Sequence, residues 1–393
     1  MFLKCRTFGE THLNTGKATG TWRISSLPSS IRKFIHSKGL SILKALFFIH
    51  LFMNLKKELL AGIRQQGGWV NTHAHFDRAY SLDENSVKEI YAPLKKKWDI
   101  VDTLKRTSSV EDVYRRMAQA TDLMLEQGVQ AFGSFIDVDE AIGEKSILAA
   151  EKLRAEYGSK IRMKFVNQTL KGVLEKEARY WFDRAVEFTD IIGGLPAKDA
   201  GREEEHLDLL LSTGRRLGKR VHVHVDQFNT DEESETELLA KKVIEHDMQG
   251  LVTAIHCISV AAHPKAKREQ IYELMREAQL SVISCPVAWI DHPRTERPAP
   301  SHNAITPVDE MLEYGIKVAL GTDNIVDVYK PFGDGDMWTE MKLLLEACKI
   351  YKPEVLIPIA TANGLDVLGL EENFGRREHQ ATSSNSFKSS PVA

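Results

Sequence analysis

The sequence predicts an α/β fold in which eight parallel strands, each followed by a helix, close into a (β/α)8 barrel of the TIM type. Two observations favour this class. Short apolar runs rich in β-branched residues alternate with longer amphipathic stretches, and histidines and an aspartate stand at the ends of four of these runs. A barrel brings such residues together at the carboxyl ends of its strands, whereas an open doubly wound sheet would spread them along a line.

The expected strands are the eight apolar runs themselves. They cover residues 68–76, 130–138, 161–168, 190–196, 220–226, 251–257, 280–286 and 317–323. Between them, apolar residues recur at helical spacing with charged residues on the opposite side, so we expect helices that cover the sheet. The clearest of these helices are at residues 110–126, 149–156, 237–246 and 267–278.

The chain of 393 residues divides by composition into a core and two atypical ends. Residues 53–372 carry the strand and helix pattern, beginning with an amphipathic helix. Residues 1–52 are rich in Ser, Thr and basic residues and show no period, so we expect a disordered or non-native extension, with the natural chain starting at Met53. A targeting segment is the alternative to a disordered extension. A membrane span is not expected, because the apolar run 40–53 is shorter than the roughly 20 residues that a span needs. The Ser-rich residues 373–393 predict a disordered tail.

Composition restricts the classes of partner. Lys and Arg number 52 against 55 Asp and Glu, a net charge of -3, which offers no field that would attract nucleic acid or an anionic membrane. The four cysteines form no CxxC pair, so neither a disulfide framework nor a thiolate zinc site is indicated. We therefore expect a cytoplasmic protein that acts on a small molecule and does not bind membranes; homo-oligomers are compatible with the sequence.

The strongest local motif is Asn-Thr-His-Ala-His at the end of the first expected strand. It places His73 and His75 on the same face of that strand, because side chains alternate along a strand. Neutral imidazole is a common ligand of zinc and similar ions. Taken alone, the motif fits equally well two hydrogen-bonded histidines at a polar barrel mouth.

Further candidate ligands follow at the ends of later strands. His224 ends the fifth, His256 the sixth and Asp323 the eighth. His222 shares the face of His224 but lies one step deeper, so we interpret it as a histidine of the core or as one that supports the metal ligands from behind. The remaining histidines of interest fall on helices or loops, where we expect them to be solvated: His206, His246, His263, His292, His302 and His379.

In the order of these residues, the span from Met53 to Glu372 resembles the amidohydrolase superfamily, in particular its cytosine-deaminase-like branch. The resemblance implies one divalent ion, zinc or iron, bound by His73, His75, His224 and Asp323. It also implies that His256 polarises the substrate or handles a proton, that Asp323 takes the proton of metal-activated water, and that Gln168 of the motif Phe-Val-Asn-Gln binds substrate.

The activity implied by the resemblance is hydrolysis of a C–N bond in a small nitrogen heterocycle or amide, by a deaminase or a cyclic amidohydrolase. Two residues depart from the pattern of the branch. Gln227 stands at the catalytic position where these deaminases have a proton-transferring glutamate, and Asn324 stands where the cytosine-specific enzymes have a second, substrate-binding aspartate. Gln227 counts against deamination of a ring amidine, and Asn324 counts against cytosine as the substrate. Cleavage of an amide or lactam, with Asp323 as sole proton carrier, remains open, and so does an inactive metal-binding protein.

Three further features refine these expectations. In members of the superfamily with two metal ions, a lysine from the fourth strand bridges the ions. The fourth strand here contains no lysine, and Lys198 lies just beyond the strand, so we expect a single ion. Trp289, in the loop after the seventh strand, would stack on a flat substrate or pack within its loop. Neither end of the chain has the composition of the β-sandwich that usually flanks the barrel in these relatives, so we expect that sandwich to be missing or truncated.

Overall fold

The computed structural model describes residues 54–228, 230–291 and 305–370. The predicted extension 1–52 and tail 373–393 lie outside these residues. Each of the eight predicted strands is present, although most are shorter than expected. They are β1 (Trp69–Ala74), β2 (Val129–Asp137), β3 (Arg162–Gln168), β4 (Ile192–Gly194), β5 (Val221–Val225), β6 (Val252–His256), β7 (Ser281–Ser284) and β8 (Val318–Leu320).

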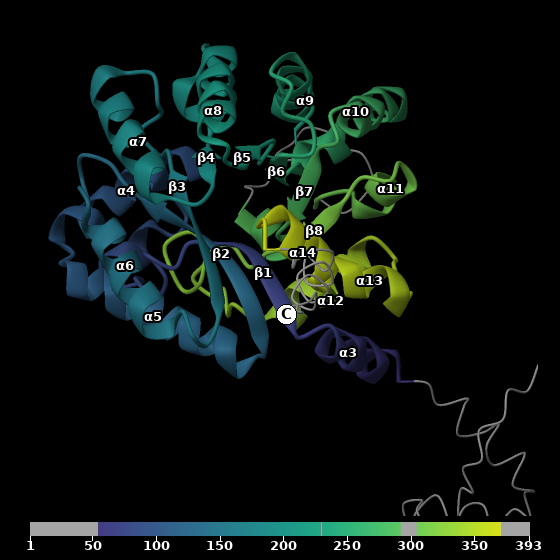
Figure 1. Cartoon of the computed structure of the whole chain (residues 1–393), viewed down its shortest axis with the longest axis horizontal. Coiled ribbons are helices and arrows are strands. Elements are labelled where there is room, and N and C mark those ends of the chain that lie inside the picture. Colours follow the sequence, from purple (N-terminus) through teal and green to yellow (C-terminus); the bar gives the residue numbers. More distant parts are fainter. Residues whose placement is uncertain (1–53, 229, 292–304, 371–393) are drawn as a thin grey trace, which may run out of the picture. The chain divides into compact units, whose positions relative to one another are not determined.

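The strands pair in parallel and in chain order, and they close into a ring. Two sheets, β1-β2-β3 and β4-β5-β6-β7-β8, carry the continuous pairing. Isolated parallel bridges join these sheets at both seams: Val166 pairs with Ile191 between β3 and β4, and Ala74 pairs with Asp323 beyond the end of β8. The open-sheet alternative is therefore excluded, and the barrel prediction is confirmed (Figure 1).

Helices surround the strands (Figure 1). The α-helices are α3 (Leu55–Gln65), α4 (Leu94–Thr107), α5 (Val110–Glu126), α6 (Lys145–Tyr157), α7 (Lys176–Phe188), α8 (Glu203–Leu217), α9 (Glu235–Glu245), α10 (Lys265–Glu277), α11 (Val308–Glu313), α12 (Met337–Ala347), α13 (Pro353–Ala360) and α14 (Ala362–Val367). Short 3-10 helices are η2 (Ser86–Glu89), η3 (Pro196–Asp199), η4 (Ile258–Ala262) and η5 (Pro286–Asp291).

Helix α5 illustrates why these segments fold as they do. Its N-terminus has a capping box, in which the Ser109 side chain accepts a hydrogen bond from the Asp112 backbone and the Asp112 carboxylate accepts one from the Ser109 backbone. Its apolar residues recur on one face, and Val113, Met117 and Met124 are fully buried against the barrel. The bounds predicted from the sequence, 110–126, agree with the structure.

The core has two layers. Apolar side chains between the strands and the helices form the larger one. The smaller layer fills the barrel, with side chains such as Val70, Phe135 and Ile255, and includes Val367 and Leu368 at the end of α14. His222 belongs to this interior: it is fully buried, and its Nε2 lies 3.0 Å from the carbonyl oxygen of Val367. The interpretation of His222 as a core histidine is therefore confirmed.

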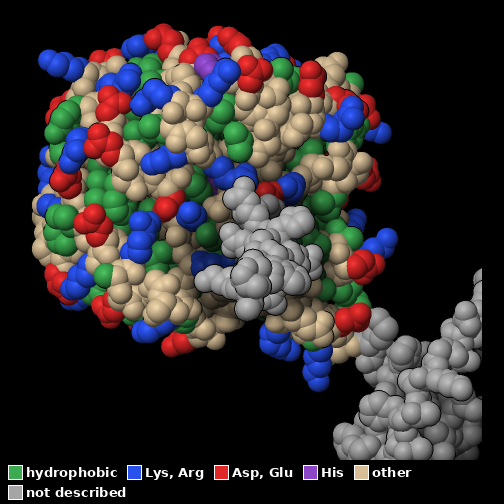
Figure 2. All heavy atoms as spheres, viewed as in Figure 1, with side chains coloured by type: hydrophobic (Ala, Val, Ile, Leu, Met, Phe, Trp, Pro, Cys, Tyr) green, Lys and Arg blue, Asp and Glu red, His purple; other side chains and the backbone are tan. Residues whose placement is uncertain are grey.

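Among the described residues, all strands belong to the barrel. Helix α3 packs against α13 and buries Leu59 and Ile63. No helix in this part of the chain combines the length and the apolar character needed to cross a membrane. Acidic and basic side chains are interspersed over the face shown in Figure 2.

Candidate active site

Two of the predicted ligands, His73 and Asp323, lie next to each other where β1 meets the end of β8. The backbone N–H of Asp323 donates to the carbonyl of His73 at 2.9 Å, and that of Thr322 donates to the same oxygen at 3.0 Å. Asn71 reinforces the seam, because its side chain donates to Thr322 Oγ1 at 2.8 Å and accepts from the Thr322 backbone at 3.1 Å. The backbone of Gly321 passes so close to His73 that a Cβ there would lie 2.8 Å from the Cβ of His73.

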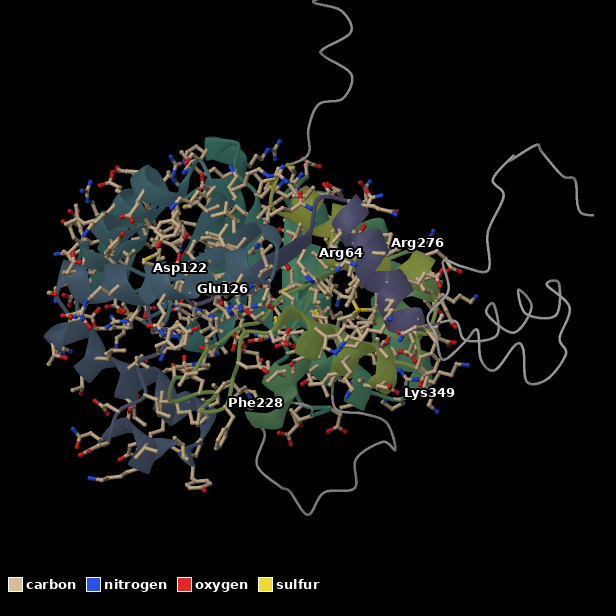
Figure 3. The ribbon with its side chains drawn as sticks, turned by 90° about the horizontal axis from the view of Figure 1, so that it is seen from below. Arg64, Asp122, Glu126, Phe228, Arg276 and Lys349 are labelled. Carbon is tan, nitrogen blue, oxygen red and sulfur yellow. The ribbon has the colours of Figure 1, made fainter. Side chains whose placement is uncertain are left out.

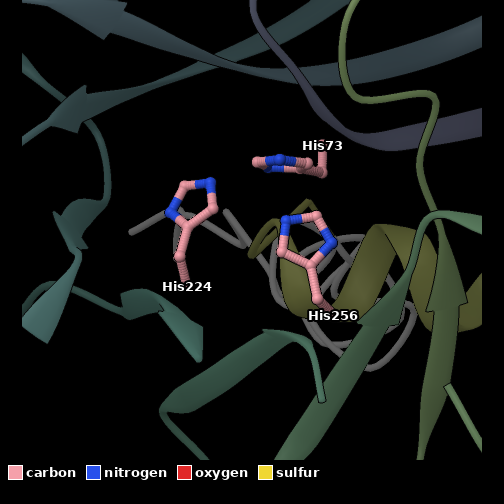
Figure 4. Close-up of side chains that lie close together, drawn as sticks. All are labelled: His73, His224 and His256. Atoms are coloured by element: carbon pink, nitrogen blue, oxygen red, sulfur yellow. The ribbon is translucent and has the colours of Figure 1, made fainter. Parts of the chain in front are cut away.

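The predicted ligands converge at the carboxyl end of the barrel. Asp323 Oδ1 lies 3.2 Å from His75 Nε2 and 3.4 Å from His73 Nε2. Two groups of side chains offer ligand atoms that all lie within 4.8 Å of one another: His73 with His75 and Asp323, and His73 with His224 and His256. Figure 4 shows the rings of the second group facing a common space.

The imidazoles of His75, His224 and His256 are neutral at physiological pH, as metal ligands must be. Burial lowers the pKa of His75 and His224 well below the ordinary value, and it lowers that of His256 to about 4. The tautomer of His224 is also fixed: its Nδ1 lies 3.3 Å from the carbonyl oxygen of Gly194, so Nδ1 carries the proton and Nε2 keeps its lone pair.

Unpaired nitrogen atoms show that these residues fit a metal ion. Both ring nitrogens of His73, and Nδ1 of His75 and His256, are buried without a hydrogen-bond partner in the described structure. A buried polar group without a partner costs about 1–3 kcal/mol, so such atoms in one cluster indicate a ligand. Imidazole nitrogens with one carboxylate oxygen form a donor set suited to zinc or divalent iron.

Two residues of the cluster have strained backbones. His256 adopts φ 77° and Asp323 φ 58°, in the left-handed region that side chains with a Cβ rarely occupy. Thr306 holds the first of them, since its Oγ1 donates to the His256 carbonyl at 2.6 Å. Strain of this kind costs on the order of 1–3 kcal/mol per residue and is concentrated at functional sites.

A pocket opens above the cluster. The space between its lining side chains, counting the part that is open solvent, is about 690 Å³. Phe228 is one of the residues that line the pocket. In Figure 3 its side chain lies at the lower edge of the molecule, away from Arg64 on α3. The lining residues are His75, Arg78, Leu94, Trp98, Gln168, Leu170, Leu195, His224, Gln227, Phe228, His256, Ile258, Ala288, Asp323, Asn324, Tyr329 and Lys330.

The predicted substrate and catalytic residues have mixed outcomes. Gln168, Gln227 and Asn324 all line the pocket. Asn324 is also tied to its neighbours, since its Oδ1 accepts from Arg78 Nε at 3.3 Å and its Nδ2 donates to Asp323 Oδ1 at 2.9 Å. The side chain of Trp289 lies outside the described part of the chain.

Arg78 is a site residue whose contacts the sequence analysis missed. Its guanidinium is buried, 3.6 Å from Asp137 Oδ2 and 3.8 Å from Asp327 Oδ2, and it contacts the ring of Tyr329. Its position three residues after His75 is the available signal. The partners lie on other strands and loops, so the sequence does not reveal them.

Helix α4 covers one side of the pocket, to which it contributes Leu94 and Trp98. Trp98 and Val101 of this helix pack with Leu170, Leu195 and neighbouring residues in a separate apolar cluster. Lys198 is the lysine that lies just beyond the fourth strand. Its Nζ is 4.9 Å from the centre of the Trp98 ring.

The prediction that His206 and His263 are solvated is wrong, because both are buried. His206 Nδ1 lies 2.6 Å from Asp199 Oδ2, and its Nε2 accepts from the backbone of Leu195 at 3.1 Å. His263 Nε2 lies 2.9 Å from a backbone carbonyl oxygen. Hydrogen bonds make this burial favourable, and helical or strand periodicity does not show the partners. His292, His302 and His379 fall outside the described residues.

Comparison with known proteins gives the family. The model of the amidohydrolase family matches residues 67–381, more than half of the chain. The chain belongs to the amidohydrolase family. It is 50% identical over 254 residues to an uncharacterised protein of Haemophilus influenzae, covering 64% of this chain and 92% of that one.

Two other relatives of this amidohydrolase are more distant. The N-isopropylammelide isopropyl amidohydrolase of Pseudomonas sp. strain ADP is 24% identical over 323 residues, 78% of this chain and 75% of that one. Among solved structures, 5-methylcytosine deaminase from Klebsiella pneumoniae with 5-fluorocytosine superposes with a TM-score of 0.70 at 23% identity, over 78% of this chain and 75% of that one. The last comparison establishes the fold.

Proposed function

We propose that this amidohydrolase hydrolyses a C–N bond of a small cyclic nitrogen compound, with one divalent ion, zinc or iron, bound by His73, His75, His224 and Asp323. The observation that carries the proposal is the convergence of these side chains from three separate strand ends, with buried ring nitrogens that have no other described partner. The uncharged imidazoles of His75 and His224 and the adjoining pocket support it.

Each residue has a defined part in this reaction. When bound, a divalent ion would lower the pKa of a water molecule towards neutral pH, and the ion would also polarise the bond under attack. Burial alone would raise the pKa of Asp323, but its contacts with His73 and His75 outweigh burial and hold the pKa well below the ordinary value. Asp323 is therefore an ionised carboxylate that accepts a proton and passes it to the departing nitrogen. His256 is neutral, and its N–H stabilises negative charge that develops on the substrate.

Gln227 favours an amide-type or amine-releasing cleavage over ring-amidine deamination. Its side chain lines the pocket, but an amide cannot transfer a proton to a ring nitrogen. Asp323 is then the proton carrier. The relative named N-isopropylammelide isopropyl amidohydrolase supports a substrate of this type.

The test is turnover by purified protein loaded with zinc, iron or manganese. Pyrimidines, oxo-triazines, hydantoins and small lactams are offered, and released ammonia or amine and opened rings are measured by mass spectrometry. We expect activity on at least one class, and a loss of about 10²-fold or more in Asp323→Asn. Asp247→Asn makes the same change on an exposed residue that follows α9 and keeps full activity.

An inactive metal-binding protein is the second candidate, and Gln227 is the observation that favours it. Full metal occupancy without turnover on any of these compounds would support it and contradict the proposal. The variant Gln227→Glu separates the two further: gain of ring deamination would identify the missing proton donor as the only defect.

A further inference from the structure

A buried pair of side chains beside β4 has no part in the reaction proposed above. Asp199 ends η3, and His206 lies in the first turns of α8, the helix that packs against β4 (Figure 1). Asp199 Oδ2 and His206 Nδ1 are 2.6 Å apart, and the two side chains are 7% and 0% exposed. Burying both groups costs their hydration, so the contacts that they make inside the protein are of interest.

The hydrogen-bonding role of each His206 nitrogen follows from its partner. A backbone N–H can only donate, so the 3.1 Å contact with the Leu195 N–H makes His206 Nε2 an acceptor. Burial lowers the pKa of His206 in spite of Asp199, so the ring is neutral at physiological pH and its single proton is on Nδ1, facing Asp199. Burial alone would raise the pKa of Asp199, but hydrogen bonds from His206 and Val173 outweigh burial and lower it. The pair is therefore a neutral imidazole that donates to a carboxylate.

The peptide unit that His206 contacts also contacts a proposed metal ligand. The Leu195 N–H and the Gly194 carbonyl belong to one peptide, and this carbonyl accepts from His224 Nδ1 at 3.3 Å. The peptide is trans, so its N–H and C=O point in opposite directions. His206 and His224 therefore bind opposite sides of one planar group.

The close approach of α8 to this peptide depends on Gly194. A Cβ at this position would lie 3.3 Å from His206 Nε2 and would overlap the side chain of Leu210 in the same helix. The absence of a side chain at the end of β4 thus lets His206 reach the Leu195 N–H.

The contacts form a continuous chain of hydrogen bonds from Asp199 to His224. The Asp199 carboxylate makes the His206 ring a stronger acceptor, and the polarised peptide in turn offers a stronger carbonyl acceptor to the His224 N–H. A stronger acceptor at Nδ1 fixes the orientation of the His224 ring and makes its Nε2 more basic, which favours metal binding.

We propose that His206, oriented by Asp199, is a positioning residue that holds the metal ligand His224 through the peptide between Gly194 and Leu195. The proposal rests on the proposed function for the presence of a metal ion at His224. The competing role is purely structural: Asp199 Oδ2 also accepts from the Val173 N–H at 2.8 Å, so the pair would only fasten the turn after β4.

Two substitutions separate these roles, because each keeps one half of the imidazole. His206→Gln can place an amide oxygen near the position of Nε2 and keep an acceptor for Leu195. His206→Asn can place an amide N–H near the position of Nδ1 and keep a donor for Asp199. The dissociation constant for zinc is measured on the full-length variants by competition with a chelator at one neutral pH. Hydrogen exchange of the Leu195 amide and the free energy of unfolding are measured on the metal-free proteins.

We expect the zinc dissociation constant to rise about tenfold or more in His206→Asn and about threefold or less in His206→Gln, since only the second keeps the link to His224. Exchange of the Leu195 amide should be faster in His206→Asn than in the wild type or His206→Gln. His246→Asn is the matched control: His246 Nε2 lies 2.8 Å from Asp208 Oδ1, a pair outside this chain of hydrogen bonds, and the zinc constant should equal that of the wild type.

An unchanged zinc constant in folded His206→Asn, or a larger rise in His206→Gln than in His206→Asn, would overturn the proposal in favour of the structural role. If His206→Asn does not fold, Asp199→Asn replaces it. Both N–H groups reach the same Asp199 oxygen, so an amide oxygen can keep the geometry while the charge is lost. The zinc constant should then rise about threefold or more, and an unchanged value would overturn the proposal.

These measurements need no turnover, so they are independent of the activity assay. Zinc binding that weakens as expected in a protein without activity on any offered compound would refute the proposed function and uphold the role of His206. An active enzyme whose zinc constant is the same in His206→Asn would refute the role of His206 alone. A wild type that binds no zinc or iron would refute both.

Discussion

At the scale of single residues, the site depends on positions where close backbone contacts restrict which side chain can be present. Gly321 passes His73 so closely that its missing side chain determines the distance between β1 and β8. Asp323 follows two residues later, in a left-handed conformation that turns it back towards the same histidine. Small changes here should therefore affect the ligands before they affect the fold.

Gly321→Ala tests this coupling. The added Cβ would meet the Cβ, backbone oxygen and backbone nitrogen of His73 at 2.8–3.0 Å, so the two strands must separate. We expect the free energy of unfolding to fall by about 1–3 kcal/mol and bound metal, measured by plasma mass spectrometry, to fall with it. Gly315→Ala is the control: its Cβ meets nothing within 4 Å, so its positive φ should cost stability while metal occupancy is retained. Equal metal content in both variants would contradict the account.

A second residue-scale prediction concerns pH. Burial, together with the nearby charge of Asp226, raises the pKa of Glu235 from its ordinary 4.5 to about 8. The folded state therefore favours the protonated carboxyl, and this contribution, complete below pH 4.5, is lost as the pH rises to about 8. Urea unfolding at pH 5 and pH 9 should show a larger loss of stability at high pH in the wild type than in Glu235→Gln. The exposed Glu313→Gln should behave as wild type, and parallel pH profiles for Glu235→Gln and wild type would refute the assignment.

At the scale of elements, α4 is held over the pocket by buried ion pairs. Lys105 Nζ lies 2.6 Å from Asp139 Oδ2 and 3.5 Å from Asp137 Oδ2, both following or ending β2. Its side chain is only 3% exposed. Because Trp98 on the same helix lines the pocket, this anchor connects the stability of α4 to the shape of the substrate site.

Lys105→Met should release the helix. Asp137 keeps its ion pair with Arg78, but Asp139 is left buried without its cation, a loss of about 3–5 kcal/mol. We expect faster hydrogen exchange across residues 94–107 and weaker ligand binding. Lys96→Met removes an exposed cation of the same helix, 3.4 Å from Glu89, and should change stability by about 1 kcal/mol or less. If both variants leave exchange in α4 unchanged, Lys105 is not its anchor.

The elements also show where sequence reasoning succeeds. The periodicity of α5 and the alternation of β1 are local, so both elements and the shared direction of His73 and His75 were predictable. The contacts of Arg78 join residues far apart in the chain, and the partners of His206 lie in the turn between β4 and α8, so local periodicity reveals neither set. The position of Asn71 beside the site was predictable in part, because Asn71 lies two residues before His73 on the same face of β1.

At the scale of the whole molecule, barrel closure makes the site. The ligand residues are spread over 251 positions of the sequence, from His73 to Asp323, and the bridge between Ala74 and Asp323 brings the two ends together. The family match is consistent with this architecture. The described barrel needs no further sheet to assemble the cluster.

The most direct measurement is metal content per chain in the wild type, His224→Gln and His222→Gln. These histidines are two residues apart on β5, but only His224 joins the cluster, whereas His222 bonds to Val367 within the barrel. The account predicts about one divalent ion in the wild type and in His222→Gln, and little or none in folded His224→Gln. Equal metal content in the two variants, or none in the wild type after loading with zinc or iron, would contradict it.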